Sequence, residues 1–346
     1  MKRFIGIDLH TNQLTVCYRQ ENGVCESKMF LVSNLEQFKA TLKKTDFVGF
    51  ESTGNSGFLY RELKGLVADI MVVNTKKFKV ITRSCCKTDK NDAYTLAEFL
   101  SKDILPESRI KNETYEDINS ILDTRERLVS SRTRLKNKIS NLLNRKGIKL
   151  SKASLNSDKK LTSLLSLELN VIVLAELGIL VDEVKHLNNQ VEMVNNLIES
   201  HTSKLHGYEN VMSIKGIGTN TAVALLCTIG NVKDFTDIKK LASYVGLAPW
   251  VSNSNETVRH GRITKNGSSL VRKMLINCAF VSVKYNPILK GFYTRLKDKK
   301  GFGKAIVATA RKLLAVVYAT LVNGWYFIDF CENKKEIKAI DWEMAF

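Results

Sequence analysis

The chain has 346 residues with a net charge of +18, from 53 lysines and arginines against 35 acidic residues. This length supports two or three domains with cores of their own, and the positive charge predicts a polyanionic partner such as nucleic acid. The seven cysteines are odd in number and form no CxxC pair. This argues against a disulfide framework or a zinc site and predicts a reduced, cytosolic protein.

The first hundred residues alternate between runs typical of strands and runs typical of helices. Gly23 marks a hairpin between the second and third expected strands. We expect strands at residues 3–8, 14–18, 28–32, 47–51 and 69–74, and helices at 35–44, at 58–67 and after residue 74 through 100. Three antiparallel strands followed by alternating helix and strand is the order of an RNase H-like α/β fold. We therefore expect such a domain at residues 1–105.

Four carboxylates stand out in this domain. Asp8 and Glu51 each follow an apolar run of strand length, and Asp89 and Asp92 are three residues apart where a helix is expected to begin. Four clustered carboxylates repel one another unless a cation lies among them, and oxygen ligands favour Mg²⁺ or Mn²⁺. The pattern predicts two-metal phosphoryl-transfer chemistry. His10, two residues from Asp8, either borders this site or is an exposed polar residue.

In the second expected region, residues 106–206, the stretch 112–205 contains little glycine and no proline, and its leucines, isoleucines and valines recur at helical spacing. We expect two long antiparallel helices in a coiled-coil arm, interrupted around residues 147–160. An ordinary helical bundle is the alternative. The first helix is strongly basic between Arg125 and Lys152, which predicts nucleic-acid contacts at Arg132 and Lys136.

The third predicted domain, residues 207–328, is mostly helical and begins with a glycine motif. Gly216 and Gly218 flank Ile217 between a short helix and an Ala/Leu-rich helix, as in a helix-hairpin-helix that binds a DNA phosphate near Thr219. A tight turn without a ligand is the alternative. The apolar run at residues 306–322 is interrupted by two basic residues, which predicts a buried helix and not a membrane span.

A polar loop is expected at residues 251–257, and Ser254 in it has no adjacent base in the sequence. From residue 259 to 312 the only acid is Asp298. We expect further nucleic-acid contacts from the basic residues after the loop, namely Arg259, Arg262, Lys265, Arg272 and Lys273. Residues 329–346 have mixed charge and are expected to form a peripheral tail.

Asp8 followed by Thr11 also resembles the phosphate loop of actin-like ATPases and sugar kinases. No adenosine-site glycine motif follows later in the chain, and a small-molecule kinase has no evident use for the large positive charge. This alternative is therefore disfavoured.

Several motifs together resemble those of insertion-sequence transposases that have a DEDD RuvC-like N-terminal domain and a serine-bearing C-terminal domain, relatives of the Piv-type DNA invertases. The resemblance covers nearly the whole chain. It depends on Gly6-Ile7-Asp8, Glu51-Ser52-Thr53-Gly54, residues 87–93, Gly216-Ile217-Gly218, Gly246-Leu247-Ala248-Pro249, residues 262–267 and residues 270–275.

This resemblance implies that Asp8, Glu51, Asp89 and Asp92 bind Mg²⁺. It also implies that the serine five residues after Pro249, which is Ser254, is a nucleophile that becomes covalently linked to DNA. The family usually has glycine after this serine, whereas this chain has Asn255, and Ser252 lies nearby as an alternative.

The resemblance further implies double-stranded donor and target DNA, a structured guide RNA encoded beside the gene, and a homo-oligomer in which the RuvC-like domain of one subunit meets the serine domain of another. Two basic surfaces suit two polyanions. The sequence therefore predicts a transposase or site-specific recombinase. The alternatives are a RuvC-like junction endonuclease that uses metal-activated water, and a non-catalytic nucleic-acid-binding protein.

Overall fold

The computed structural model describes residues 2–78, 88–254 and 257–327, without the side chains of residue 152 and of residues 252–254 and 257–260. The expected tail at 329–346 lies outside these residues, as do residues 79–87 of the helix expected after residue 74. Residue contacts divide the chain into two compact units, Met1–Glu113 and Thr114–Phe346. Each unit is described by itself. The finer division of the second unit into an arm and a third domain stays a prediction.

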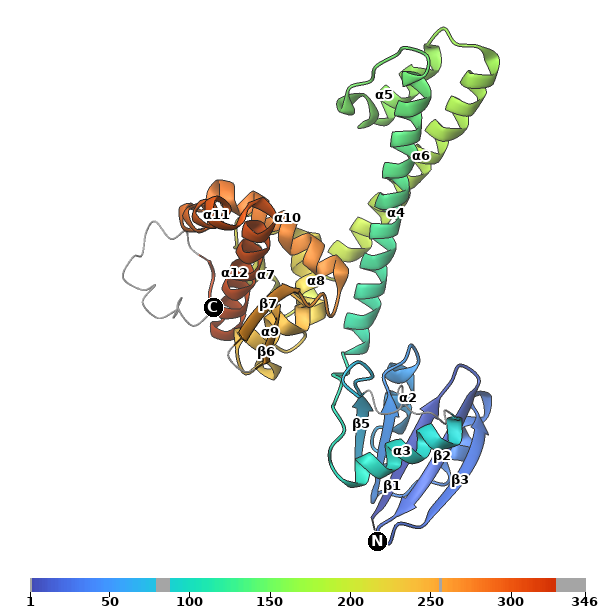
Figure 1. The fold of residues 1–346 in the computed structure, drawn as a ribbon. Coiled ribbons are helices and arrows are strands. Elements are labelled where there is room, and N and C mark those ends of the chain that lie inside the picture. The colour runs from blue at the N-terminus through green and yellow to red at the C-terminus, as the bar shows by residue number, and fades with distance from the viewer. Residues whose placement is uncertain (1, 79–87, 255–256, 328–346) are drawn as a thin grey trace. The chain divides into compact units, whose positions relative to one another are not determined.

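The first unit is built on a mixed five-stranded sheet (Figure 1). Its strands are β1 (Arg3–Leu9), β2 (Gln13–Gln20), β3 (Cys25–Leu31), β4 (Asp46–Glu51) and β5 (Asp69–Val73), in the spatial order β3-β2-β1-β4-β5. The first three strands pair antiparallel, and β4 joins β1 and β5 in parallel. This order is compatible with the RNase H-like fold expected from the sequence.

Helices cover both faces of this sheet. One face packs Ile7 and Phe50 against helices α1 (Leu35–Lys39) and α2 (Ser56–Leu63). The other face packs Phe4 and Phe47 against α3 (Asp89–Ser101). Because strand residues alternate between faces, Asp8 and Glu51 are directed to the side of α3.

All five predicted strands of this unit are present, whereas the three predicted helices are shorter than expected. Residues 75–77, where the third was expected to begin, form a turn, and α3 begins at Asp89. Helix α1 follows the η1 turn (Val32–Asn34) and ends five residues early, because the segment after it bonds locally: the Thr41 hydroxyl donates to the Phe38 carbonyl and Lys43 N–H donates to buried Asp46. Helix α2 ends before Gly65, whose φ of +86° leaves the helical region.

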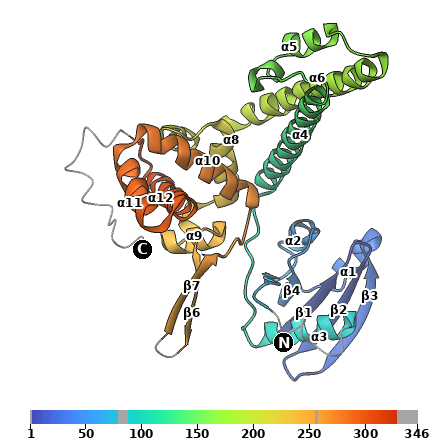
Figure 2. The same cartoon turned by 45° about the horizontal axis from the view of Figure 1, so that its top comes forward.

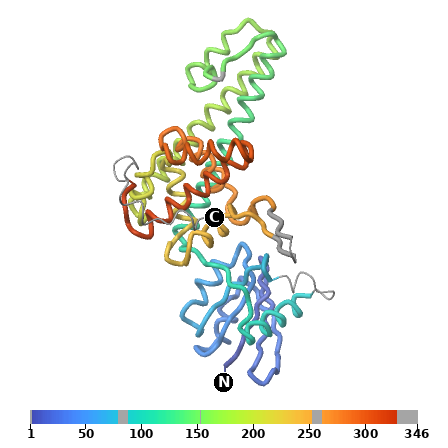
Figure 3. Tube along the Cα trace, turned by 60° about the vertical axis from the view of Figure 1, so that its left-hand side comes forward, coloured from blue at the N-terminus to red at the C-terminus, as the bar shows by residue number. Residues whose placement is uncertain are grey.

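The second unit contains the predicted pair of long helices, α4 (Glu113–Asn144) and α6 (Val171–Glu199), joined through η3 (Lys152–Leu155), α5 (Asp158–Ser163) and η4 (Leu164–Ser166). Figure 3 shows α4 and α6 side by side. The Arg125 side chain donates to Asn195 and that of Arg132 donates to Asn188, so the two helices run antiparallel. The C-terminal part of α4, the N-terminal part of α6 and the segment between them share one core. It is built from Ile139, Leu143, Leu155, Leu161, Leu164, Leu177, Leu180, Val181 and Val184.

The rest of this unit is a helical core. Its elements are η5 (Thr202–Lys204), α7 (Tyr208–Met212), α8 (Thr219–Ile229), η6 (Val232–Asp234), α9 (Ile238–Val245), α10 (Ser269–Tyr285), α11 (Pro287–Lys300) and α12 (Phe302–Asn323). Among the described residues, α12 has the length and composition to cross a membrane. Half of its most apolar 18-residue stretch is buried inside the protein. Leu313, Leu314 and Val317 of α12 lie in the core, which accounts for the apolar sequence.

The expected polar loop at 251–257 is wrong. Strands β6 (Pro249–Ser254) and β7 (Thr257–Ile263) form an antiparallel hairpin, which extends away from the helices of its unit in Figure 2. The β-branched and aromatic residues Trp250, Val251, Val258 and Ile263 favour strands on either side of a two-residue connection. The polar residues between them obscure this pattern in the sequence.

Candidate active site

Asp8 and Glu51 are placed by the central pair of parallel strands. Ile7 of β1 pairs with Phe50 of β4, so Asp8 and Glu51 are the next residues along two adjacent strands. Helix α3 crosses this face closely at Gly6, where a side chain would collide with the backbone of Ala93 and Ala97. The bare backbone at Gly6 therefore lets the first turn of α3 approach Asp8.

The first turn of α3 supplies the other two predicted carboxylates. Thr88 caps the helix, and its hydroxyl accepts from the Asn91 N–H at 3.3 Å. Asp89 and Asp92 follow in the first turn, where the helix dipole favours negative charge. The Asp89 side chain is 47% exposed, whereas Asp92 is buried. The helix start thus presents one open and one enclosed carboxylate.

His10 lies between two of these carboxylates. Its Nε2 is 3.2 Å from an Asp8 oxygen and 3.5 Å from an Asp89 oxygen. Gln13 on β2 also donates to Asp89, at 3.2 Å. Ligand atoms of Asp8, His10 and Asp89 all lie within 4.8 Å of one another, the only such group among the described residues. The structure thus brings strand β1 and helix α3 together at one point.

The environment raises the pKa of Asp8 above its ordinary value. Burial is the main cause, and the charges of Asp89 and Asp92 raise this pKa further, while His10 lowers it. Asp92 lies three residues after Asp89 in the first turn of α3 and is not part of the group within 4.8 Å. A partly buried carboxylate with like charges nearby gains from a neighbouring cation, and carboxylate oxygens suit Mg²⁺ or Mn²⁺. These residues therefore fit a divalent metal, with Glu51 on the neighbouring strand as a further ligand candidate.

Ser254 is the last residue of β6 and pairs with Thr257 of β7. Its side chain, together with those of Ser252 and Arg259, lies outside the described residues. The backbone places Ser254 at the end of the hairpin, next to the connection between its strands. Its role as a nucleophile stays a prediction.

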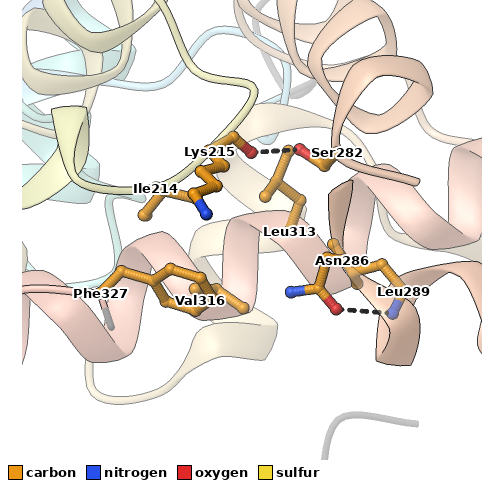
Figure 4. A pocket seen from close by; sticks show the side chains of 8 residues that line it. All are labelled: Ile214, Lys215, Ser282, Asn286, Leu289, Leu313, Val316 and Phe327. Carbon is orange, nitrogen blue, oxygen red and sulfur yellow. Dashed lines mark hydrogen bonds between the residues drawn. The ribbon is translucent and has the colours of Figure 1, made fainter. Parts of the chain in front are cut away.

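The glycine motif joins α7 to α8 by a turn that packs on α10. Gly216 has a φ of +102°, and a side chain there would collide with the Ser282 hydroxyl. That hydroxyl donates to the Lys215 carbonyl at 3.0 Å, as Figure 4 shows. The pocket drawn there is lined mainly by apolar side chains such as Leu313 and Val316, and it is too small for a substrate. Gly218, in contrast, begins α8 with open space around its Cα.

Two transposase family models match separate parts of the chain. A DEDD-type IS110 transposase model matches residues 5–147, and a model described as "Transposase IS116/IS110/IS902 family" matches residues 208–294. The chain belongs to this transposase family. Its members are DNA recombinase enzymes, and the first match contains the four carboxylates of the candidate site.

Several curated proteins resemble this transposase along most of their length. A transposase for insertion sequence element IS1111A from Coxiella burnetii is 25% identical over 93% of this chain and 90% of the relative. A transposase for insertion sequence element IS1328 from Yersinia enterocolitica is 24% identical over 80% of this chain and 83% of the relative. A pilin gene-inverting protein from Moraxella bovis is 28% identical over 68% of this chain and 66% of the relative.

Several basic residues that were expected to contact nucleic acid have partners inside the transposase. Arg272 donates to the carbonyls of Val245 and Gly267, both at 3.1 Å, and to that of Asn266. Lys273 forms an ion pair with Glu126. The Arg132 side chain bonds Asn188 across the arm. Burial and the neighbouring Arg132 lower the pKa of Lys136, which is partly buried.

Two other predicted contacts are open to solvent, and a third is partly so. Arg262 and Lys265 are exposed at and just beyond the end of β7. Thr219 is partly buried beside the Tyr208 hydroxyl, which donates to it at 3.3 Å. The exposed pair near the hairpin and the open N-terminus of α8 are therefore the predicted contacts that remain most accessible.

Sequence spacing indicates His10 only weakly as a member of the site and does not indicate Gln13. His10 follows the end of β1, so strand alternation does not fix its direction, and its position depends on the turn into β2. Gln13 reaches Asp89 across 76 residues of sequence. The spacing from Asp8 allowed two interpretations of His10, one of which made it a neighbour of the site, but its place between two carboxylates depends on how α3 packs.

Proposed function

We propose that this chain is the transposase of an insertion sequence and that it cuts and rejoins DNA through a covalent serine–DNA intermediate. The observation that carries the metal-dependent part is the convergence of Asp8, His10 and Asp89 within 4.8 Å on an RNase H-like strand order. Family membership and the likeness to a pilin gene-inverting protein support recombination rather than simple hydrolysis.

In this proposal Asp8, Glu51, Asp89 and Asp92 hold Mg²⁺ or Mn²⁺. The bound ion would neutralise charge on the scissile phosphate. The Ser254 oxygen, after losing its proton, forms a bond to phosphorus while a sugar oxygen of the cut strand leaves as a hydroxyl. A hydroxyl on a second strand then attacks the same phosphorus and releases Ser254, so each phosphodiester bond broken is replaced.

The remaining partners follow from family resemblance and charge. We propose that the transposase works in the cytoplasm as a homo-oligomer on double-stranded donor and target DNA, guided by a structured RNA. The basic first helix of the arm and the basic region after residue 259 suit two polyanions. We also propose three functional regions at residues 1–105, 106–206 and 207–328, with a tail at 329–346.

Trapping of the covalent intermediate tests this function. The transposase is incubated with DNA carrying its element ends, with Mg²⁺ and with the RNA transcribed from the flanking noncoding DNA, and then denatured and resolved by gel. Wild type should form a protein–DNA adduct that both Ser254→Ala and Asp8→Asn lose. Ser252→Ala is the matched control and should retain the adduct.

Each other outcome has a definite meaning. An adduct that persists in Ser254→Ala contradicts the serine assignment, and its loss in Ser252→Ala alone transfers the role to Ser252. Metal-dependent nicks without an adduct in wild type indicate a junction endonuclease that uses water. Adduct formation that is unchanged by ribonuclease treatment and by omission of the RNA contradicts the guide-RNA proposal.

A further inference from the structure

The β6–β7 hairpin carries an exposed aromatic side chain that the proposed chemistry does not use. Trp250, the second residue of β6, is 55% exposed, and its neighbour Val251 is 46% exposed. Indole rings normally bury most of their large apolar surface. A half-exposed tryptophan on a strand that ends at Ser254 is therefore a candidate contact surface.

Strand β7, which pairs with β6, has a glycine where the indole packs. A Cβ built on Gly261 of β7 would lie 2.8 Å from the Trp250 ring atom Cε3, closer than side chains approach. The ring thus lies over bare backbone and would have to move if Gly261 had a side chain. Gly261 has no positive φ, so its lack of a side chain is needed for this contact rather than for a turn.

The surroundings of Trp250 are basic. Arg262 is adjacent to Gly261 in β7, and Lys265 lies three residues further on; both are exposed. From residue 249 to 265 the sequence contains three lysines and arginines and the single acid Glu256. An aromatic surface beside cations is the arrangement with which proteins bind unpaired bases, since the ring stacks on the base and the cations meet the phosphates.

We propose that Trp250 stacks on an unpaired base of the DNA strand that the transposase cuts, with Gly261 supporting the ring. Ser254 is four residues further along β6, roughly 13 Å at the rise of an extended strand. A base stacked on Trp250 would then lie within a few nucleotides of a phosphate held at Ser254. The choice of DNA as ligand rests on the proposed function, whereas the stacking does not require Ser254 to be the nucleophile.

Binding to matched oligonucleotides tests the stacking. The full chain is titrated with single-stranded oligothymidylate and with an abasic strand of the same length and phosphate count. If stacking is worth about 1–3 kcal/mol per base, wild type should prefer the strand with bases by roughly 5- to 150-fold. Trp250→Ala should lose most of this preference and Trp250→Phe should keep part of it. Gly261→Ala should weaken it while the tryptophan remains.

Two controls separate stacking from general effects. Trp325 is 50% exposed in the same unit, so Trp325→Ala removes a comparable indole and should leave the preference unchanged. Lys265→Ala should weaken binding of both strands equally. Ser254→Ala should retain the preference even if the adduct assay fails, which keeps this inference distinguishable from the proposed function.

A preference for bases that is unchanged in Trp250→Ala overturns the proposal. The proposal is also overturned if Trp325→Ala reduces the preference for bases as much as Trp250→Ala does. If Trp250→Ala instead dissociates the oligomer in sedimentation experiments and leaves base preference intact, the exposed indole belongs to a protein interface. An oligouridylate strand bound in preference to the DNA strand, with the difference lost in Trp250→Ala, assigns the surface to RNA and also overturns the proposal.

Discussion

At the scale of single residues, Asp8 is in an unfavourable electrostatic position when no cation is bound. Burial and the nearby charges of Asp89 and Asp92 raise its pKa, and His10 only partly opposes them. The carboxylate is therefore less stable in the folded protein than in the unfolded chain. Such a position is costly for folding but suited to a metal ligand, since binding of a cation would offset the repulsion.

This argument predicts how Asp8→Asn changes stability. Because the folded pKa of Asp8 lies above its unfolded value, the free energy of unfolding falls as pH rises between the two values, and the full cost remains above the folded pKa. In chelator at neutral pH, Asp8→Asn should therefore have a higher Tm than wild type. Mg²⁺ at a hundred times its Kd should stabilise wild type by about 2.7 kcal/mol and the variant much less. Differential scanning calorimetry measures both effects.

Asp46→Asn is the matched control in the same sheet. Asp46 is buried and accepts from the Arg3 guanidinium at 2.9 Å and 2.5 Å, so its carboxylate is well paired. This variant should have a lower Tm than wild type in both chelator and Mg²⁺. A lower Tm for Asp8→Asn in chelator would show that Asp8 is not under electrostatic stress.

The positions of Asp8, Glu51, Asp89 and Asp92 could be predicted because each is tied to a local pattern. Two follow apolar strand runs, and two lie just after a capping threonine. His10 and Gln13 could not be placed, since they belong to a turn and to a strand whose relation to α3 depends on the close approach at Gly6. Likewise, the contacts of Arg272 are to carbonyls up to 27 residues away in sequence.

At the scale of elements, the turn between α7 and α8 combines two glycines with different surroundings. Gly216 has a left-handed backbone and packs against Ser282, so the fold requires it. Gly218 has a φ of −102°, precedes the first N–H groups of α8 and has open space around it. The packing of this turn on α10 was not visible in the sequence, where both glycines fitted a phosphate-binding role equally well.

The two alanine variants should therefore behave differently. Gly216→Ala should lower the free energy of unfolding by roughly 1–3 kcal/mol, because the new methyl group meets Ser282 and the backbone is strained. Gly218→Ala should unfold within about 1 kcal/mol of wild type but bind duplex DNA more weakly, since the methyl group occupies the approach to the α8 N-terminus. Thermal unfolding and DNA titration distinguish them. Gly218→Ala with wild-type affinity would favour a turn without a ligand.

The composition of each strand explains whether it could be predicted from the sequence. The central strands β1 and β4 have apolar runs inside polar ends, and they were found with small changes in bounds. The β6–β7 hairpin was missed because its strands contain Ser252, Asn253 and Ser254, which are typical of loops. Pairing between Ser252 and Arg259 is a property of the hairpin as a whole. Local polarity therefore concealed an element that carries the predicted nucleophile.

At the scale of the whole molecule, the charge of +18 predicts nucleic-acid binding but does not identify which cations make contact. Contacts inside the second unit show which of the basic residues already have partners within the protein. Arg125 donates to Asn195, Arg272 donates to three carbonyls, and Lys273 pairs with Glu126. Burial also lowers the pKa of Arg125 and of Arg272. Net charge therefore overstates the number of cations available to DNA.

The salt dependence of DNA binding should reveal this division. Each phosphate contact contributes about 0.9 to the slope of log K against log salt, because neutralising a phosphate releases counterions. Lys265→Ala should reduce the slope by about 1 and leave Tm unchanged, since Lys265 is exposed. Arg272→Ala should instead lower Tm and leave the slope near the wild-type value, because its guanidinium is occupied by backbone carbonyls. A slope reduced by about 1 in Arg272→Ala at unchanged Tm would mean that this arginine leaves those carbonyls to bind phosphate, and the internal contacts would then be a resting arrangement of the DNA-free protein.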